Sequence, residues 1–340
     1  MSGRRNINAL FLLLLLAFPL LFVLNLSVGS VDISIADLFL VLKGEATKSS
    51  HELIFFQSRL PKAFTALICG ASLSVSGLLM QSLFRNPLAG PYILGISSGA
   101  GLGVALVVMG ATLFGIGLSA SFTIPLAAVL GALLILFILF LVSLRLKDVM
   151  TLLILGIMLG SIATAIVGII QYFTTDFQLK SFLIWTLGSL EGLSYAELKL
   201  LAAINGLALI AAFLLNKPLN AFLLGEDYAK SMGIAVKSSR LFIILISGIL
   251  AGLITAYCGP IGFVGIIVPH LCRLLFKSSN HRILIPAAVL MGAELLLLSD
   301  VLAQLPGNGV KLPINSVSSI IGIPIILWII FKKRSISKSF

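Results

Sequence analysis

Long apolar segments recur along the whole chain, and they restrict its possible folds more than any other feature. The first, residues 9–26, contains no charged residue. An apolar helix of about 20 residues spans the hydrocarbon core of a bilayer. With 59% hydrophobic and only 10% charged residues among 340, a soluble fold could not bury so much apolar surface. The chain is therefore predicted to be an all-α polytopic membrane protein.

The polar breaks between these segments predict about ten transmembrane helices in a single domain over residues 1–340. The eighth is short and is expected to be interrupted by Pro269, and the tenth is expected to begin as a re-entrant segment and break near residues 322–324. Residues 172–197 are amphipathic and are expected to form a pair of interfacial helices. The ten expected spans are residues 9–26, 61–83, 92–110, 119–144, 150–171, 196–215, 241–257, 259–276, 283–305 and 311–330.

Glycines spaced four residues apart mark two of these spans. Gly95, Gly99 and Gly103 form a stripe in the third, and Gly156 and Gly160 repeat the spacing in the fifth. Such stripes let a neighbouring helix approach closely. They therefore predict tight packing within the bundle.

The basic residues predict how the chain lies across the membrane. Most of the 23 lysines and arginines fall in segments that ten spans place on the same side as both termini. Loops rich in lysine and arginine face the cytoplasm, so both termini are expected there. The net charge of +11 is interpreted as a consequence of topology and of contact with anionic lipid, and no nucleic-acid partner is expected.

A polar segment, residues 216–240, separates the sixth and seventh spans. It contains a short amphipathic pattern between two glycines, with acidic residues at its start, and is predicted to form a helix. From the residues alone, it is either a solvated connection or a helix exposed for a soluble partner. The predicted helix with its flanking glycines comprises Gly225, Glu226, Asp227, Tyr228, Ala229, Lys230, Ser231, Met232 and Gly233.

Catalytic signatures are missing from the sequence. It contains no GxxxxGK[ST] motif that would cradle ATP, no HExxH and no nucleophile elbow. The three cysteines are isolated, without CxxC spacing, so no metal or cofactor is expected on this chain. An ion-coupled secondary transporter would need paired intramembrane charges and inverted repeats, and neither is evident. The chain is not expected to be an enzyme or to have its own energy source.

Ionisable residues are rare in the middle of the predicted spans, where Glu294 lies, with Asp300 nearer the outer end of the same span. Glu294 is either a substrate or proton site, or a carboxyl that faces the bundle interior. His270 follows Pro269 near a helix start, where a packing or interface role is favoured over a metal-ligand role.

Three ordered blocks carry a family resemblance: residues 59–103 (RLPKAFTALICGASLSVSGLLMQSLFRNPLAGPYILGISSGAGLG), GPIGFVGIIVPHLCRLL with the following HRILIP, and LPINSVSSIIGIP. They resemble the FecCD-type family of bacterial ABC importer permeases, which carry iron-siderophores, haem and cobalamin. The resemblance implies a type II ABC importer permease fold in the cytoplasmic (inner) membrane, with a second permease copy that forms a homodimer around a central pathway. It also implies two cytoplasmic P-loop ATPase subunits that hold ATP and Mg, and an external binding protein.

The same resemblance implies the cargo and the functional positions. The expected cargo is an iron chelate, either a siderophore complex or haem, with cobalamin as the alternative. Residues 216–240 would be the cytoplasmic coupling loop, and the helix at 225–233 its contact with the ATPase. The positions implied or inferred for other roles are Arg59 and Lys62 for docking of the binding protein, Lys147, Asp148, Val149, Met150 and Thr151 for the cytoplasmic gate, and Phe182, Trp185, Pro269 and His270 for the outer gate and pathway.

The docking assignment has an alternative in the residues themselves. Arg59 and Lys62 lie one turn apart where the second span begins, and basic side chains at such positions also anchor helices to lipid headgroups. Three positions depart from the family pattern. Lys62 stands where an arginine is common, Gln304 where many relatives carry a basic residue, and Glu294 lies outside the pattern.

Overall fold

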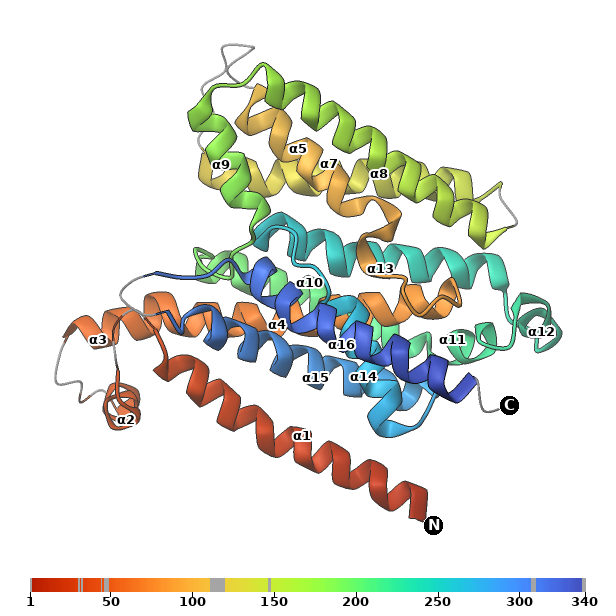
Figure 1. Cartoon of the computed structure of the whole chain (residues 1–340), viewed down its shortest axis with the longest axis horizontal. Helices are drawn as coiled ribbons and strands as arrows, with labels where there is room; N and C mark the ends of the chain where they lie inside the picture. Colours follow the sequence, from red (N-terminus) through yellow and green to blue (C-terminus); the bar gives the residue numbers. More distant parts are fainter. Residues whose placement is uncertain are drawn as a thin grey trace.

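The computed structural model describes residues 2–29, 31, 33–43, 45, 49–110, 120–145, 148–306 and 310–337, and these residues contain helices and no strand (Figure 1). The helices are α1 (Ser2–Ser27), α2 (Ile35–Lys43), α3 (Ser49–Ile54), the π-helix η1 (Phe55–Arg59), α4 (Leu60–Leu83), the 3₁₀-helix η2 (Pro91–Leu94), α5 (Ile96–Val108), α7 (Ala120–Ser143), α8 (Val149–Tyr172), α9 (Asp176–Thr186), α10 (Tyr195–Leu214), α11 (Asn216–Phe222), α12 (Glu226–Ser231), α13 (Val236–Cys258), α14 (Val264–Phe276), α15 (His281–Ala303) and α16 (Ile314–Ser337).

The described residues contain seven helices that are long and apolar enough to cross a membrane. Three shorter apolar helices lie in α5, α14 and α16. Each of the ten expected spans corresponds to one of these helices. The predicted class, an all-α polytopic membrane protein, is confirmed.

Helix α4 is the centre of the bundle and packs against α13, α14 and α15. Its small residues permit this packing. A Cβ atom added at Gly77 would lie 1.7 Å from the carbonyl oxygen of Gly265 in α14, and one at Gly70 would lie 2.1 Å from that of Gly292 in α15. The backbones therefore touch where α4 crosses these two helices, and no larger side chain fits there.

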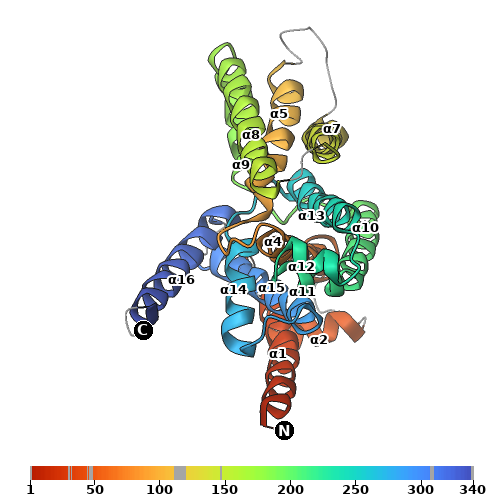
Figure 2. The ribbon, with the colours of Figure 1, turned by 90° about the vertical axis from the view of Figure 1, so that its right-hand side faces the viewer.

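The predicted glycine stripes lie at the contacts of α5 with its neighbours. A Cβ atom at Gly103 would lie 2.0 Å from the carbonyl oxygen of Ala127 in α7, and Gly99 faces α7 in the same way. Gly95, at the start of α5, lies against Gly156 and Gly160 of α8. The expected tight packing is confirmed. Figure 2 shows α5, α7 and α8 on one side of α13, with α16 and α1 on the other.

Three local expectations are wrong. Between the end of α8 at Tyr172 and the start of α10 at Tyr195, the chain forms one helix, α9, rather than a pair. Helix α14 continues through Pro269, and α16 begins at Ile314 and continues through Pro324 without a break. A proline removes one backbone donor from a helix, but neighbouring helices and small local adjustments compensate for that loss in transmembrane helices. Buried Pro269 lies in such packed surroundings.

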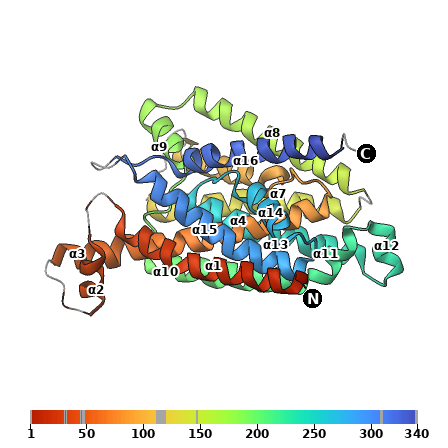
Figure 3. The same ribbon diagram turned by 60° about the horizontal axis from the view of Figure 1, so that its bottom comes forward.

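The start of α1 and the end of α16 lie at the same end of the bundle as α11 and α12, whereas α2, α3 and α9 lie at the opposite end (Figures 1 and 3). This arrangement agrees with both termini lying on one side of the membrane.

The charge distribution predicts which side that is. A reporter fused after Ser278, between α14 and α15, is expected to behave as cytoplasmic, and one inserted after Gly192, between α9 and α10, as external. Accessibility of single cysteines to a membrane-impermeant thiol reagent at the same two positions provides an independent measurement. An external signal at Ser278 would contradict the ten-span arrangement.

Candidate coupling and gating surface

A cleft of about 540 Å³ lies at the α12 end of the bundle. The turn after α4, the start of α8 and the α11–α12 segment form its walls. The cleft therefore brings much of the predicted coupling helix and of the predicted gate to one surface. Its lining includes Arg85, Asp148, Val149, Met150, Gly225, Glu226, Asp227, Tyr228 and Lys230.

Helix α12 forms where the sequence predicts it. Gly225 precedes it with φ of +114°, and Gly233 follows it with φ of +78°, conformations that favour glycine. Glu226 and Asp227 occupy its first turn, and Lys230 its last, which matches the polarity of the helix dipole.

One side of α12 packs against the bundle and is hydrogen-bonded to it. Ala229 is fully buried, and the Glu226 carboxylate oxygens accept hydrogen bonds of 2.6 and 2.7 Å from Arg240 Nη2 of α13. The other side faces outward. Tyr228 and Met232 are 50% and 59% exposed. An exposed aromatic side chain and a methionine among charges are typical of a protein-docking surface.

The predicted gate residues lie at the start of α8, and Lys147 falls outside the described residues. Asp148 caps the helix by accepting hydrogen bonds from the Thr151 hydroxyl at 2.7 Å and from the backbone N–H groups of Thr151 and Met150 at 2.9 and 3.2 Å. The hydrogen bonds from Thr151, followed by that from Met150, hold the pKa of Asp148 below its usual range. Asp148 and Thr151 therefore set where α8 begins, while Met150 is exposed toward the cleft.

The predicted outer gate residues occupy two separate places. Phe182 is buried in α9 and stacks with Trp185, with ring centroids 6.1 Å apart. Pro269 and His270 lie in the middle of α14, far from α9 in Figures 1 and 2.

Backbone hydrogen bonds fasten the end of α9 to two other helices. Ser189 N donates to the Cys258 carbonyl at the end of α13 at 2.8 Å, and Asn315 N at the start of α16 donates to the Leu187 carbonyl at 3.3 Å. A movement of α9 would therefore displace both helix ends.

Arg59, a predicted docking position, is buried within this chain. The residue is 4% exposed. Its guanidinium donates to the carbonyl oxygens of Leu26 at 2.5 Å, Ser27 at 2.7 Å and Val31. The first two carbonyls end α1, so Arg59 satisfies acceptors at the negative end of that helix.

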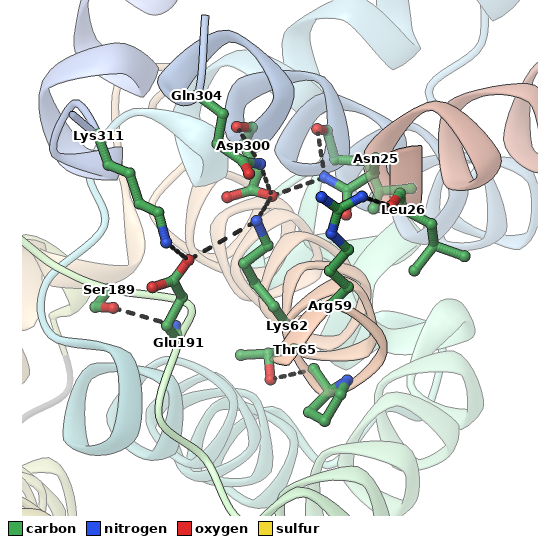
Figure 4. A network of polar contacts seen from close by, with 12 residues as sticks. Asn25, Leu26, Arg59, Lys62, Thr65, Ser189, Glu191, Asp300, Gln304 and Lys311 are labelled. Carbon is green, nitrogen blue, oxygen red and sulfur yellow. Dashed lines mark hydrogen bonds and ion pairs between the residues drawn. The ribbon is translucent and has the colours of Figure 1, made fainter. Parts of the chain in front are cut away.

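Lys62, the second predicted docking position, is also buried, at 3% exposure. Its ammonium lies 3.0 Å from Asp300 Oδ2 and 3.8 Å from Glu191 Oε1 (Figure 4). Glu191 Oε1 also accepts from Lys311 Nζ at 2.6 Å. Carboxylates of the chain itself thus already pair with this cation. The predicted docking role of Arg59 and Lys62 remains untested.

Two amides complete what we call the Lys62–Asp300 network, which consists of Asn25, Lys62, Glu191, Asp300, Gln304 and Lys311. Asn25 Nδ2 of α1 donates to Asp300 Oδ2 at 2.8 Å, and Gln304 Nε2 donates to the same atom at 3.0 Å. Gln304 stands where many relatives carry a basic residue, and in this chain it donates a hydrogen bond to the buried Asp300 carboxylate. This network was not predicted from the sequence, where the position of Asp300 near the end of a span was the available signal.

Glu294 lies in the middle of α15 and is 8% exposed. Its Oε1 atom has no hydrogen-bond partner within the described part of the chain. The structure thus agrees with a carboxyl buried in the bundle, and a transport role for Glu294 remains a prediction.

The FecCD transport family model matches residues 14–332. The chain belongs to the FecCD transport family. It is 37% identical over 291 residues to the vitamin B12 import system permease protein BtuC of Klebsiella pneumoniae subsp. pneumoniae, covering 86% of each chain. The BtuC protein of Salmonella paratyphi A is 36% identical over 292 residues, 86% of this chain and 88% of that protein. The resemblance of the three sequence blocks is thereby confirmed.

Solved structures confirm the FecCD permease fold. A structure described as "an inward-facing conformation of a putative metal-chelate type ABC transporter" matches with a TM-score of 0.84 and 30% identity, covering 96% of this chain and 99% of that one. PsaBC from Streptococcus pneumoniae in complex with Fab matches with a TM-score of 0.53 and 14% identity, covering 85% of this chain and 94% of that one. The second likeness concerns the fold alone. The chain is a multi-pass permease of an ABC importer.

Proposed function

We propose that this permease imports a corrinoid of the vitamin B12 type. The observation that carries this proposal is the 37% identity to a vitamin B12 import permease over 86% of both chains. The sequence analysis placed an iron chelate first and cobalamin second, and the relatives favour the second. Both cargoes are large metal chelates, in agreement with the metal-chelate type of the similar solved structure.

Import would be driven by partner subunits. The sequence has no P-loop motif, so ATP and Mg would be held by two cytoplasmic ATPase subunits, and an external binding protein would deliver the cargo. A second copy of this chain would complete the pathway. Helix α12 is the proposed contact with the ATPase, supported by its exposed Tyr228 and Met232 and its fastened opposite side.

The cleft suggests how such a contact could act on the gate. Helix α12 and the start of α8 line the same cleft. Glu226 and Arg240 join α12 to α13, which in turn packs against α4 and α7. Closure of the ATPase pair would move α12 as a rigid body, and the bundle would pass between two discrete packings. In this proposal Val149 and Met150 move with the cleft wall and gate the pathway.

The cargo is tested by uptake into cells that lack their own corrinoid and iron-chelate permeases. The chain is expressed with an ATPase and a binding protein from the same source organism, and radiolabelled cyanocobalamin and ferric-siderophore uptake are compared. Cyanocobalamin accumulation that requires all three components is the expected result. Uptake of the ferric chelate without cyanocobalamin would instead support the iron-chelate assignment.

Removing the outward side chains of α12 is expected to weaken ATPase binding. In Tyr228→Ala/Met232→Ala, binding of the ATPase to the purified permease should weaken at least about tenfold, because buried aromatic anchors dominate the energy of such interfaces. Affinity is measured by titration in detergent. The control is Phe39→Ala in α2, an exposed aromatic residue at the opposite end of the bundle. Unchanged ATPase binding in the double variant would refute the assignment of α12.

A further inference from the structure

His281 is fully buried at the first residue of α15, and its imidazole joins two other helices. Its Nδ1 atom lies 2.7 Å from Asn220 Oδ1 in α11, and its Nε2 atom lies 2.6 Å from Ser82 Oγ in the last turn of α4. The His281 backbone N–H also donates to Asn220 Oδ1, at 2.9 Å. A continuous polar chain thus runs from α11 through α15 to α4.

The surrounding hydrogen bonds determine which atoms donate and which accept along this chain of polar side chains. Asn280 Oδ1 accepts from the backbone N–H of Arg282 at 3.0 Å, so it is an acceptor, and the Asn220 Nδ2 amide must donate to it, at 3.1 Å. Asn220 Oδ1 is then an acceptor as well. His281 therefore carries its proton on Nδ1, and in the neutral ring Nε2 accepts from the Ser82 hydroxyl.

The last turn of α4 is also held by the residue next to Ser82. Gln81 Oε1 accepts from Arg273 Nη1 at 2.5 Å, and Gln81 Nε2 donates to the Ile266 carbonyl at 3.1 Å. Both partners belong to α14. The end of the central helix is thus hydrogen-bonded to α14 and α15, and through His281 to α11.

We propose that the Asn220–His281–Ser82 chain positions α4 relative to α11 and carries movements of α12 to the central helix. This inference rests on the proposed role of α12. Residues 223–225 alone separate α11 from α12. A displacement of α11 must either break the hydrogen-bond chain or move the end of α4. Breaking it is costly because the fully buried His281 and Ser82 side chains would lose their partners. His281 is a positioning residue and has no contact with cargo in this proposal.

Two buried serines provide a matched test. Ser82 Oγ and Ser299 Oγ each lie 2.8 Å from the carbonyl oxygen four residues earlier in their own helix, and Ser82 Oγ also lies 2.6 Å from His281 Nε2. Ser82 has one hydroxyl proton, and in the arrangement above it donates that proton to His281 Nε2 in place of the carbonyl. Ser82→Ala and Ser299→Ala therefore each remove one buried hydroxyl beside a helical carbonyl, and they differ in the link to α11. His281→Asn is the second variant, because its amide can keep the donor toward Asn220 but is too short to reach Ser82.

The assay uses the complete transporter in proteoliposomes, with its ATPase and binding protein, and radiolabelled cyanocobalamin as the probe. Ser82→Ala and His281→Asn are each expected to lower cargo moved per ATP hydrolysed at least about fivefold, the lower end of typical coupling between sites. Stimulation of ATP hydrolysis by the binding protein, a second readout that does not depend on cargo identity, should fall in parallel. Ser299→Ala should move as much cargo per ATP as the parent. The double variant Ser82→Ala/His281→Asn should lose no more coupling than either single variant, because both substitutions break the same link.

Several outcomes would overturn the proposal: undiminished coupling in both variants, an equal loss in Ser299→Ala, or losses that multiply in the double variant. A variant that fails to assemble is replaced in this comparison by Ser82→Thr, which keeps the hydroxyl and should keep the coupling. Loss of coupling in Ser82→Thr would also overturn the proposal. ATPase affinity separates the two hypotheses, because it should be normal in Ser82→Ala and weakened in Tyr228→Ala/Met232→Ala. Normal affinity in the latter refutes the role of α12 itself.

Discussion

Lys62→Met is expected to destabilise the folded permease by about 3–5 kcal/mol, the usual effect of removing one partner from a buried ion pair. The Lys62 ammonium lies 3.0 Å from Asp300 Oδ2, and both residues are buried. Without it, the Asp300 carboxylate would keep two amide donors, Asn25 and Gln304, but would lose the cation that lies 3.0 Å away. The measurement is the loss of folded protein with temperature or denaturant in detergent micelles.

The chain offers a control that differs mainly in exposure. Lys311 pairs with Glu191 at 2.6 Å, but its side chain is 40% exposed. Exposed ion pairs contribute about 1 kcal/mol or less, so Lys311→Met should change stability little. A double variant, Lys62→Met/Asp300→Leu, should recover part of the loss because no unpaired charge is left. Equal effects of Lys62→Met and Lys311→Met would show that the buried pair is not a major contributor.

Gly77→Ala is expected to prevent normal assembly of the bundle. The added Cβ would lie 1.7 Å from the Gly265 carbonyl oxygen, where α4 crosses α14. A flexible side chain could move away, but here the obstacle is backbone, so the two helices must separate along their contact. We expect a loss of at least about 3 kcal/mol, the upper end for overpacked cores. Yield of monodisperse protein and thermal stability in detergent are the measurements.

Gly206→Ala in α10 is the matched control for this substitution. A Cβ at Gly206 would meet no described atom within 4 Å. Alanine also favours helix over glycine by about 1 kcal/mol, so this variant should be as stable as the parent or more so. Normal yield and stability of Gly77→Ala would mean that α4 and α14 are further apart than the structure shows.

The packing of α4 indicates how the proposed coupling would operate. Helix α4 is closely packed along its length, and its last turn is tied to α11, α14 and α15. A central helix with such contacts moves as a unit. A displacement of α12 would therefore also shift the opposite end of α4. The Lys62–Asp300 network lies at that other end and joins α4 to α1, α15 and the α9–α10 connection.

Composition and local pattern were sufficient to predict the class of fold, the approximate spans, helix α12 and the family. Each of these depends on properties that are local in the chain. An apolar run of sufficient length crosses a membrane whatever surrounds it. The two glycines around α12, with acidic residues at its start, determine a short helix in the same local way. The three family blocks are likewise contiguous stretches of sequence.

Which charged residues are exposed, by contrast, depends on how the helices pack. Arg59 and Lys62 were predicted to dock a partner because they begin a span in a polar region, yet both are buried against groups distant in sequence. The same holds for His281, whose partners Ser82 and Asn220 lie on other helices. A polar side chain is exposed or buried according to which acceptors the packed helices bring to it, and helix packing is set by contacts between residues far apart in the chain. Local composition therefore cannot determine it.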